Sequence, residues 1–308
     1  GDAQQSVRPG IDVAVTREPV GVVALITPWN FPIAIPAWKI APALAYGNCV
    51  VLKPAELTPG CAHVIAQLLH KHGCPAGVFN LLMGPGSVVG DALVSHPGVD
   101  AVSFTGSAAT GSRIAATCGT LRRKVQLEMG GKNPMVVMDD ADLRTAVQAC
   151  LNGAFFSTGQ RCTASSRLIV QKGIHDAFVE MLGREMRALR VGDALQADTQ
   201  IGPVVDQRQL DSNLAYVELA RSEAAEVIGG ERLELDKPGF YQAPALFLET
   251  TNDARINREE IFGPCASVIR VEDFDEALAI ANDTEFGLSA GICTGSLKYA
   301  SEFRRRVE

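Results

Sequence analysis

The chain has 308 residues, enough for about two domains, and 47% of them are hydrophobic, as in proteins with a substantial buried core. Its formal net charge of −7, with no cluster of Lys and Arg beyond Arg304-Arg-Arg306, argues against binding to nucleic acid or to an anionic membrane. No apolar run reaches the ~18 residues of a membrane span, and the start has no basic segment followed by an apolar core.

The eight cysteines are widely spaced and form no Cys-x-x-Cys pair, which argues against a metal site or a disulfide framework. A chain with many unpaired cysteines fits a reducing compartment, so we expect a cytoplasmic protein without a bound metal. The cysteines stand at positions 49, 61, 74, 118, 150, 162, 265 and 293.

In the first 140 residues, apolar runs alternate with stretches of helical period, the pattern of a parallel sheet covered by helices. We predict strands near 20–27, 49–53, 78–83, 101–105 and 125–128. Helices are predicted at 58–72, 87–95 and 107–118, with Thr58, Ser87 and Ser107 suited to N-cap positions. Two of the strands lead through a glycine turn into a helix, which points backbone N–H groups at an anion such as a pyrophosphate.

A second alternation follows and predicts a second α/β domain, with no internal repeat. Strands are predicted at 135–139, 166–171, 266–271 and 289–294, and helices at 143–156, 174–189 and 205–225. Surface loops are predicted at 191–202 and 229–242, which are rich in Gly, Pro and charge. Near the start, residues 11–15 alternate like an edge strand.

Cys162 lies in Thr-Gly-Gln-Arg-Cys-Thr (158–163), in a loop between a predicted helix and a predicted strand. Glu128, 34 residues earlier, ends an apolar strand in Leu-Glu-Met-Gly-Gly-Lys (127–132). A thiol can attack a carbonyl carbon, and a carboxylate can activate the water that later releases the acyl group. Taken singly, the cysteine is more often an inert packing residue and the glutamate a solvated strand end.

Four further segments accompany this pair: Ile-Thr-Pro-Trp-Asn-Phe-Pro (26–32), Val-Leu-Lys-Pro-Ala-Glu (51–56), Val-Ser-Phe-Thr-Gly-Ser (102–107) and Glu-Glu-Ile-Phe-Gly-Pro (259–264). In this order, the six segments closely resemble the NAD(P)-dependent aldehyde dehydrogenase superfamily, from about Glu18 to the last residue. The resemblance implies two Rossmann-like three-layer α/β/α domains and part of an oligomerisation arm. The implied division is an arm segment at 1–18, a partial NAD-binding domain at 19–131 and a catalytic domain at 132–308.

Two longer phrases, at 38–48 and 155–164, look most like the branch that includes α-ketoglutaric semialdehyde dehydrogenases. Family members begin before Gly1 and continue past Glu308, so the chain resembles an internal piece that lacks both family termini. The family also implies a homodimer or homotetramer for the full-length protein.

By resemblance, Cys162 attacks an aldehyde, a hydride passes to the nicotinamide, and a thioester remains on the sulfur. Glu128 then takes a proton from the hydrolytic water. Family members that transfer the acyl group to coenzyme A typically lack this glutamate, so the expected product is a free acid. Asn30, otherwise an ordinary turn residue, is expected to donate to the developing oxyanion together with the backbone N–H of Cys162.

The resemblance also assigns residues to the cofactor. Lys53 and Glu56 are expected at the adenosine ribose, where a carboxylate favours NAD although NADP remains possible. Ser107 is expected to contact the pyrophosphate, and Glu260 and Phe262 the nicotinamide ribose and ring. The complete predicted set is Trp29, Lys53, Glu56, Gly86, Gly106, Ser107, Glu260 and Phe262.

The expected substrate is a small aldehyde, and a carboxylated semialdehyde is one candidate. Phe31, Ile35, Trp38 and Phe156 match positions that line the family's aldehyde tunnel. Arg161 either faces a substrate carboxylate or serves as a packing residue.

Two other classes of protein are disfavoured by the sequence. No histidine belongs to a matching motif, which disfavours a Cys-His hydrolase. An inactive or truncated protein of this fold that only binds nucleotide is disfavoured by the presence of every catalytic residue, and the absent family termini keep it open.

Overall fold

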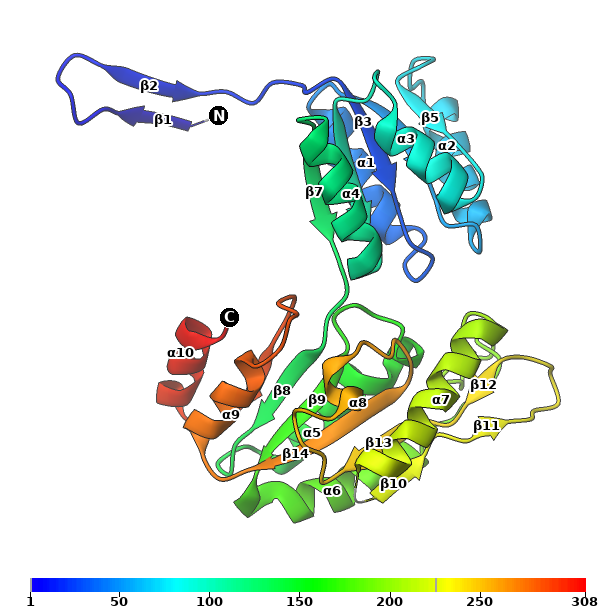
Figure 1. Ribbon diagram of the computed structural model, residues 1–308, viewed down its shortest axis with the longest axis vertical. Helices are drawn as coiled ribbons and strands as arrows, with labels where there is room; N and C mark the ends of the chain where they lie inside the picture. Colours follow the sequence, from blue (N-terminus) through cyan, green and yellow to red (C-terminus); the bar gives the residue numbers. More distant parts are fainter. Residues whose placement is uncertain (1, 225) are drawn as a thin grey trace. The chain divides into compact units, whose positions relative to one another are not determined.

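The computed structural model describes residues 2–224 and 226–308. The chain divides into two compact units, residues 1–129 and 130–308. Each unit is a mainly parallel sheet with helices on both faces, and Figure 1 labels their elements. The predicted α/β class is confirmed.

The first unit contains a five-stranded sheet with the order β5-β4-β3-β6-β7, in which every pair is parallel. Its strands are β3 (Val22–Ile26), β4 (Cys49–Lys53), β5 (Phe79–Leu81), β6 (Ala101–Thr105) and β7 (Lys124–Glu128). All five predicted strands are present. The central strand β3 is buried on both faces, as its continuous apolar run requires.

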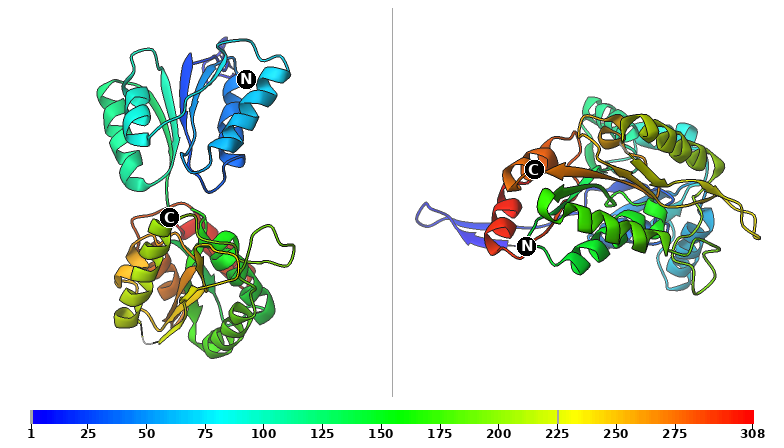
Figure 2. Two further views of the ribbon diagram at one scale, coloured as in Figure 1. Left: turned by 90° about the vertical axis from the view of Figure 1, so that its right-hand side faces the viewer. Right: turned by 90° about the horizontal axis from the view of Figure 1, so that it is seen from below.

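Two helices cover each face of this sheet, and the left view of Figure 2 shows the sheet between them. They are α1 (Ala34–Ala45), α2 (Pro59–Lys71), α3 (Asp91–Ser95) and α4 (Ala108–Thr120). Successive residues of β3 point to opposite faces. Leu25 therefore packs with Ile40 of α1, while Ala24 packs with Ile114 of α4.

The predicted helix starts have different outcomes. Ser107 is the N-cap of α4 and accepts a hydrogen bond from the Thr110 N–H at 3.4 Å. Thr58 occupies the N-cap position of α2 without a capping side-chain bond. The cap predicted at Ser87 is wrong, because the chain already turns at Gly86, where a π-helical turn η1 (Gly86–Gly90) leads into α3.

An antiparallel hairpin precedes the sheet and consists of β1 (Asp2–Gln5) and β2 (Asp12–Val15). The predicted edge strand at 11–15 is thereby confirmed, and the exposed Val13 and Val15 belong to it. Residue 1 of the predicted arm lies outside the described residues.

The second unit contains a six-stranded sheet with the order β10-β13-β14-β9-β8-β15. Only β10 runs antiparallel to its neighbour. The strands are β8 (Asn133–Val137), β9 (Ser165–Gln171), β10 (Glu226–Gly229), β13 (Ala245–Leu248), β14 (Cys265–Val271) and β15 (Gly291–Cys293).

Alternation along β13 shows which helices share a face. Leu246 and Leu248 belong to the core that includes α5 (Leu143–Phe155) and α6 (Lys172–Arg187). Ala245 and Phe247 point the other way, toward α7 (Gln207–Glu223) and α8 (Arg255–Arg258). Alternate residues of β14 pack on that second face against α9 (Phe274–Asn282), with α10 (Leu297–Arg306) beside it.

Two predictions in this unit need correction or completion. The helix predicted at 205–225 corresponds to α7, and residue 225 lies outside the described residues. The loop predicted at 229–242 contains a short antiparallel pair, β11 (Arg232–Leu233) and β12 (Tyr241–Gln242). The Gly and Pro content of this segment predicted a loop and gave no sign of the pair. The pair is stabilised by the burial of Tyr241 and Gln242.

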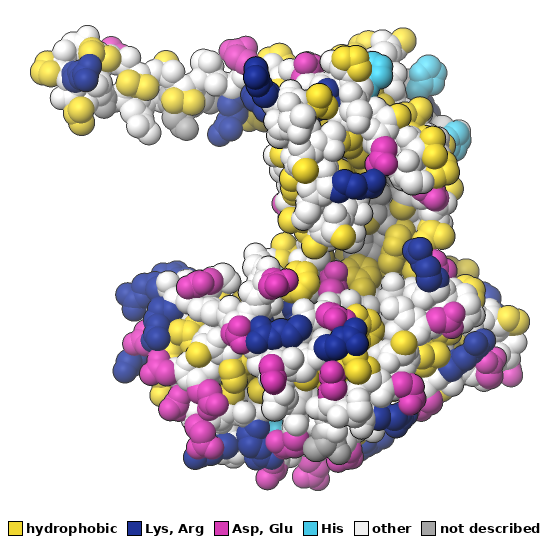
Figure 3. All heavy atoms as spheres, viewed as in Figure 1, with side chains coloured by type: hydrophobic (Ala, Val, Ile, Leu, Met, Phe, Trp, Pro, Cys, Tyr) yellow, Lys and Arg dark blue, Asp and Glu magenta, His cyan; other side chains and the backbone are white. Residues whose placement is uncertain are grey.

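Within the described ranges, no helix has the length and apolarity needed to cross a membrane. On the face drawn in Figure 3, basic and acidic side chains intermingle over the second unit, with a basic group over α10. More hydrophobic side chains show on the surface of the first unit, where Trp38, Leu121 and Val125 are among the exposed residues.

Candidate active site

The sheet of the first unit has a topological switch point between β3 and β6. The chain leaves β3 for α1 on one face and leaves β6 for α4 on the opposite face. In open parallel sheets, ligands bind in the crevice outside the carboxyl ends of the strands at such a point. Trp29 and Asn30 follow β3, and Gly106 and Ser107 follow β6, so these predicted residues border the switch point.

The structure brings Lys53, Glu56 and Gly86 together. The Lys53 Nζ lies 3.2 Å from the Glu56 Oε1, and the Gly86 N–H donates to the same oxygen at 2.6 Å. The Gly86 N–H and Lys53 lower the pKa of the Glu56 carboxyl from its usual value. Glu56 therefore presents an ionised and exposed carboxylate at the end of β4.

The turn from β6 into α4 requires a glycine. A Cβ on Gly106 would meet the Phe104 ring at 2.4 Å. The Gly106 N–H donates to the Glu128 carbonyl at 3.1 Å, which ties the ends of β6 and β7 together. With Ser107 at the start of α4, this turn offers an anion the N-terminus of a helix. The residues at this edge thus fit a dinucleotide.

Glu128 belongs to a hydrogen-bonded group that sequence analysis missed. The Lys39 Nζ donates to the Ser103 Oγ at 2.7 Å and to the Gln126 Oε1 at 3.1 Å, and the Gln126 Nε2 donates to the Glu128 Oε1 at 2.8 Å. Burial lowers the pKa of Lys39 to about 8, and the nearby Glu128 charge opposes that shift. A lysine in the otherwise apolar helix α1 was the available signal.

In the second unit, Cys162 lies in a tightly held loop between α5 and β9. Ser157, Thr158 and Gly159 in succession have left-handed backbone angles, with φ of 56°, 59° and 64°. The Thr158 Oγ1 donates to the Gly202 carbonyl at 3.0 Å, and the Val205 N–H donates to the Gln160 Oε1 at 2.9 Å. Non-glycine residues adopt this conformation only where surrounding contacts enforce it.

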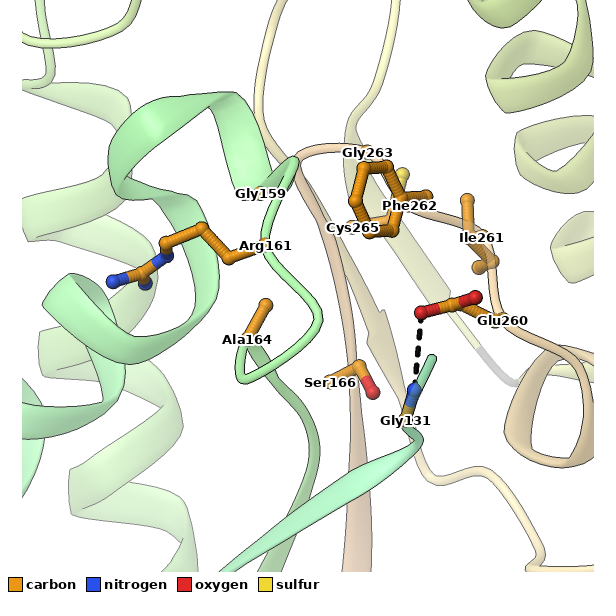
Figure 4. Close-up of a pocket in the computed structure, with 10 residues that line it drawn as sticks. All are labelled: Gly131, Gly159, Arg161, Ala164, Ser166, Glu260, Ile261, Phe262, Gly263 and Cys265. Atoms are coloured by element: carbon orange, nitrogen blue, oxygen red, sulfur yellow. Dashed lines mark hydrogen bonds between the residues drawn. The ribbon is translucent and has the colours of Figure 1, made fainter. Parts of the chain in front are cut away.

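The loop packs directly on the segment 259–264. A Cβ on Gly159 would come within 2.0 Å of the Gly263 carbonyl oxygen. Together with Gly131, the two segments line the small pocket drawn in Figure 4, whose cavity volume of about 10 Å³ has room for about one water molecule. Three of the motifs singled out in the sequence therefore converge within the second unit.

Glu260 is held over the two glycines that follow Met129. It accepts a hydrogen bond from the Gly131 N–H at 3.1 Å (Figure 4), and a Cβ on Gly130 would lie 2.2 Å from its Oε2. Burial raises the pKa of this carboxyl. The adjacent Lys132 is 1% exposed, and burial lowers its pKa to about 7. Sequence analysis did not single out Lys132.

Arg161 makes contacts of the kind that a packing role predicts. Its guanidinium donates to the Asn152 and Gly153 carbonyls at 2.6 and 2.7 Å, near the end of α5. Figure 4 shows the side chain pointing away from Glu260 and Phe262. The geometry thus favours the structural alternative for Arg161 over a contact with a substrate carboxylate.

The remaining predicted residues differ in exposure. Ile35 is 4% exposed, Trp38 is 68% exposed and Phe31 is half-buried, all three in or just before α1. Phe156 is half-buried against the core of the second unit. Phe262 has a φ of 59°, an uncommon value for a bulky side chain. Among the described residues, no group of His, Cys, Asp and Glu is arranged to hold a metal ion.

These features define a two-unit α/β protein with a strand edge that fits a dinucleotide and a partly buried cysteine loop. The model of the aldehyde dehydrogenase family matches residues 1–308, and the chain belongs to this family.

Individual relatives agree with that assignment. The chain is 50% identical over 301 residues to the α-ketoglutaric semialdehyde dehydrogenase of Bacillus subtilis, a match that covers 96% of this chain and 62% of that protein. It is 44% identical over 310 residues to the 2,5-dioxopentanoate dehydrogenase of Saccharolobus solfataricus, covering 100% of this chain and 64% of that protein. The chain thus spans less than two thirds of the length of these relatives, and the predicted resemblance to their branch is confirmed.

A solved structure extends the likeness to three dimensions. The crystal structure of betaine aldehyde dehydrogenase from Staphylococcus aureus in complex with NAD⁺ matches with a TM-score of 0.95 and 37% identity. The match covers 100% of this chain and 62% of that chain.

Proposed function

We propose that the protein to which this chain belongs oxidises an aldehyde to the carboxylic acid through a thioester on Cys162. The observation that carries the proposal is the fixed Cys162 loop in a chain of the aldehyde dehydrogenase family. Bound NAD, or NADP, supplies the acceptor for the hydride.

In this proposal, the Cys162 thiolate attacks the aldehyde carbon. The Asn30 amide and the Cys162 backbone N–H donate to the oxygen that becomes negatively charged. Glu128 removes a proton from the water that cleaves the thioester, so the acid leaves and the thiol is regenerated. The bond between Gln126 and Glu128 supports this role, because it gives the carboxylate a fixed neighbour.

The adenosine end of the cofactor is proposed to bind at Lys53 and Glu56, and its pyrophosphate at Gly86, Gly106 and Ser107. The observed cluster of Lys53, Glu56 and Gly86 supports this assignment. An ionised carboxylate at this place repels a 2′-phosphate, so we propose a preference for NAD. Trp29, Glu260 and Phe262 are proposed for the remainder of the cofactor.

A carboxylated semialdehyde is the proposed substrate, since the two relatives are named for α-ketoglutaric semialdehyde and 2,5-dioxopentanoate. Phe31, Ile35, Trp38 and Phe156 are proposed to line its path. The Arg161 Nη2 donates to backbone carbonyls, and we propose that another group meets the substrate carboxylate. We further propose a cytoplasmic homo-oligomer, for which the exposed apolar side chains of β2 offer contact surface.

The test measures NADH absorbance with a panel of aldehydes and semialdehydes in the complete gene product. Cys162→Ala is expected to abolish turnover, because the residual protein has no nucleophile for acyl transfer. The matched control is Cys74→Ala, which changes another partly buried cysteine and should keep activity within about twofold. NADH formation by the Cys162→Ala protein at the wild-type rate would refute the mechanism. Binding of NAD without turnover of any aldehyde would favour the nucleotide-binding alternative.

A further inference from the structure

Asn133, the first residue of β8, makes three hydrogen bonds through its side chain while only 4% exposed. Its Nδ2 donates to the Cys162 carbonyl at 2.7 Å and to the Ala164 carbonyl at 2.9 Å. Its Oδ1 accepts from the Ser289 N–H at 3.0 Å. Both protons of the amide are used on the loop that carries Cys162.

We propose that Asn133 is a positioning residue for the Cys162 nucleophile, a role that rests on the proposed function of Cys162. The amide fixes the carbonyl on one side of the cysteine and the carbonyl two residues later. The loop closes on itself through the Arg161 N–H to the Gly159 carbonyl at 2.9 Å and the Ala164 N–H to the Arg161 carbonyl at 3.1 Å. The peptide groups around Cys162 are thus fixed by hydrogen bonds within the loop and by hydrogen bonds from Asn133.

The backbone at the start of β8 is closely packed against Asn133 and Cys162. A Cβ on Gly131 would lie 2.7 Å from both the Asn133 Oδ1 and the Cys162 carbonyl oxygen. The pairing of β8 and β9 is irregular at the same place, because Asn133 pairs with Ser165 and Pro134 with Arg167. Pro134 has no N–H to donate, and at this irregular end of the pair the Asn133 side chain donates to the Cys162 and Ala164 carbonyls.

The chemistry of the residue also matters. A primary amide carries two donors and an acceptor on one short side chain. Aspartate keeps the acceptor for Ser289 but turns a negative charge toward two carbonyl oxygens, and alanine removes all three bonds. Because the Cys162 N–H is a proposed oxyanion donor, a shift of the Cys162 peptide displaces the sulfur and this donor together. A displacement of about 1 Å can slow chemistry ~10²-fold.

A merely structural role predicts a different outcome, and the chain offers a matched control. Asn48 in the first unit is 8% exposed and likewise makes three backbone hydrogen bonds. Its Nδ2 donates to the Ala43 carbonyl at 3.0 Å, and its Oδ1 accepts from the Val20 and Gly21 N–H groups at 2.7 and 3.2 Å. It lies just before β4, at the amino end of the strand, whereas Asn30 and Glu128 of the same unit lie beyond or at the carboxyl ends of β3 and β7.

The experiment compares Asn133→Ala and Asn133→Asp with Asn48→Ala and Asn48→Asp in the complete protein. Three quantities are measured: the single-turnover rate of NADH formation at saturating semialdehyde, the NAD dissociation constant, and deuterium exchange of the peptide that spans residues 157–164. We expect both Asn133 variants to lower the single-turnover rate roughly 10- to 100-fold and to speed exchange of this peptide. The Asn48 variants should leave the single-turnover rate and the exchange rate of this peptide within about twofold of the wild type. The NAD dissociation constant should change little in any variant that stays folded.

Each outcome decides the proposal. Unchanged exchange of the 157–164 peptide in the Asn133 variants overturns it, because the loop is then not held by Asn133. Faster exchange with an unchanged single-turnover rate also overturns it, since the loop is then held without effect on the nucleophile. If the wild-type protein forms no NADH with any aldehyde, the proposed function fails and with it the role of Asn133 in positioning a nucleophile. The exchange data still report whether the amide braces the loop.

Discussion

The two α/β units use opposite edges of their sheets. In the first unit, the candidate residues follow the carboxyl ends of β3, β4, β6 and β7. In the second unit, the cysteine loop precedes β9 and the segment 259–264 precedes β14, so the site lies at the amino ends of the strands. In the first unit, strand topology creates a crevice at the carboxyl edge of the sheet. In the second unit, strand topology creates no crevice at the amino edge where the cysteine loop lies.

The two units also differ in how many polar side chains they bury. Most of the buried polar side chains among the described residues belong to the second unit, including Lys132, Asn133, Thr158 and Arg167. In the first unit, the candidate groups Glu56, Ser107 and Glu128 are exposed and lie on or just beyond strand ends. A crevice made by topology binds a ligand with few supporting bonds, while a nucleophile at the other edge needs a dedicated frame of hydrogen bonds.

The prediction with the largest expected effect asks whether Glu128, at the carboxyl edge of the first sheet, takes part in the reaction. Glu128→Gln should slow thioester hydrolysis ~10²–10⁴-fold, because the amide cannot take a proton from water. The first turnover should remain fast, so a burst of NADH precedes slow turnover in stopped-flow measurements. Equal slowing of the burst and of the steady state would remove Glu128 from the hydrolytic step.

The next prediction concerns the packing of the cysteine loop on Gly263 in the second unit. Gly159→Ala should lower the free energy of unfolding by roughly 2–5 kcal/mol, because the added Cβ meets the Gly263 carbonyl and the backbone is left-handed. Gly77→Ala in the first unit is the control. Its φ is 84° but nothing lies within 4 Å of the added Cβ, so only the conformational cost of about 1 kcal/mol applies. Similar losses for both variants in denaturant titrations would show that contact with Gly263 is unimportant.

The buried lysines provide a third comparison. Burial lowers the pKa of Lys132 in the folded protein to about 7, whereas the usual pKa of a lysine is 10.5. The unfolded chain therefore binds more protons between these two values, and the free energy of unfolding rises with pH across this window. Lys132→Met should remove the cost of burying this charge, roughly 5 kcal/mol from the difference between the two pKa values, and raise the melting temperature most at pH 7 and below. Lys39→Met should do less, since the folded pKa of Lys39 is about 8. A Lys132→Met protein whose pH dependence of melting matches that of the wild type would contradict the assignment.

The smallest effect concerns the cofactor edge. Glu56→Gln should narrow the preference for NAD over NADP in kcat/KM by roughly fivefold, the effect of about 1 kcal/mol of repulsion between charges in water. Lys53 should then meet the 2′-phosphate without competition. Wild-type preference for NADP, or an unchanged ratio in the variant, would show that Glu56 does not face the ribose.

The sequence was sufficient for the parts of the fold that repeat a pattern. The strands of the first unit follow from apolar runs, and Ser107 at the start of α4 follows from its capping chemistry. Asn133 and Lys39 could not be found in this way, because their partners are 29 or more residues away in the chain. The π-helical turn at Gly86 and the pair β11-β12 were missed because each is too short to show a period.

Arg161 illustrates a different limit. A cationic side chain beside the cysteine can bind a substrate carboxylate, or it can donate to the free carbonyls at the end of a helix. The residue type alone does not distinguish these two roles. Only the positions of the Asn152 and Gly153 carbonyls favour the second.

The order of strands in the second unit has a consequence for folding. Asn133 in β8 pairs with Ser165 in β9 across 32 residues of chain, whereas Arg167 in β9 pairs with Ser267 in β14 across 100. Loop closure over a longer stretch is slower, so the β8–β9 pair should form before β14 joins it. Gly263, against which Gly159 packs, arrives only with β14. A ribosome-bound chain would therefore carry Cys162 for some time in a loop without its final support, and the thiol should be most open to oxidation during synthesis.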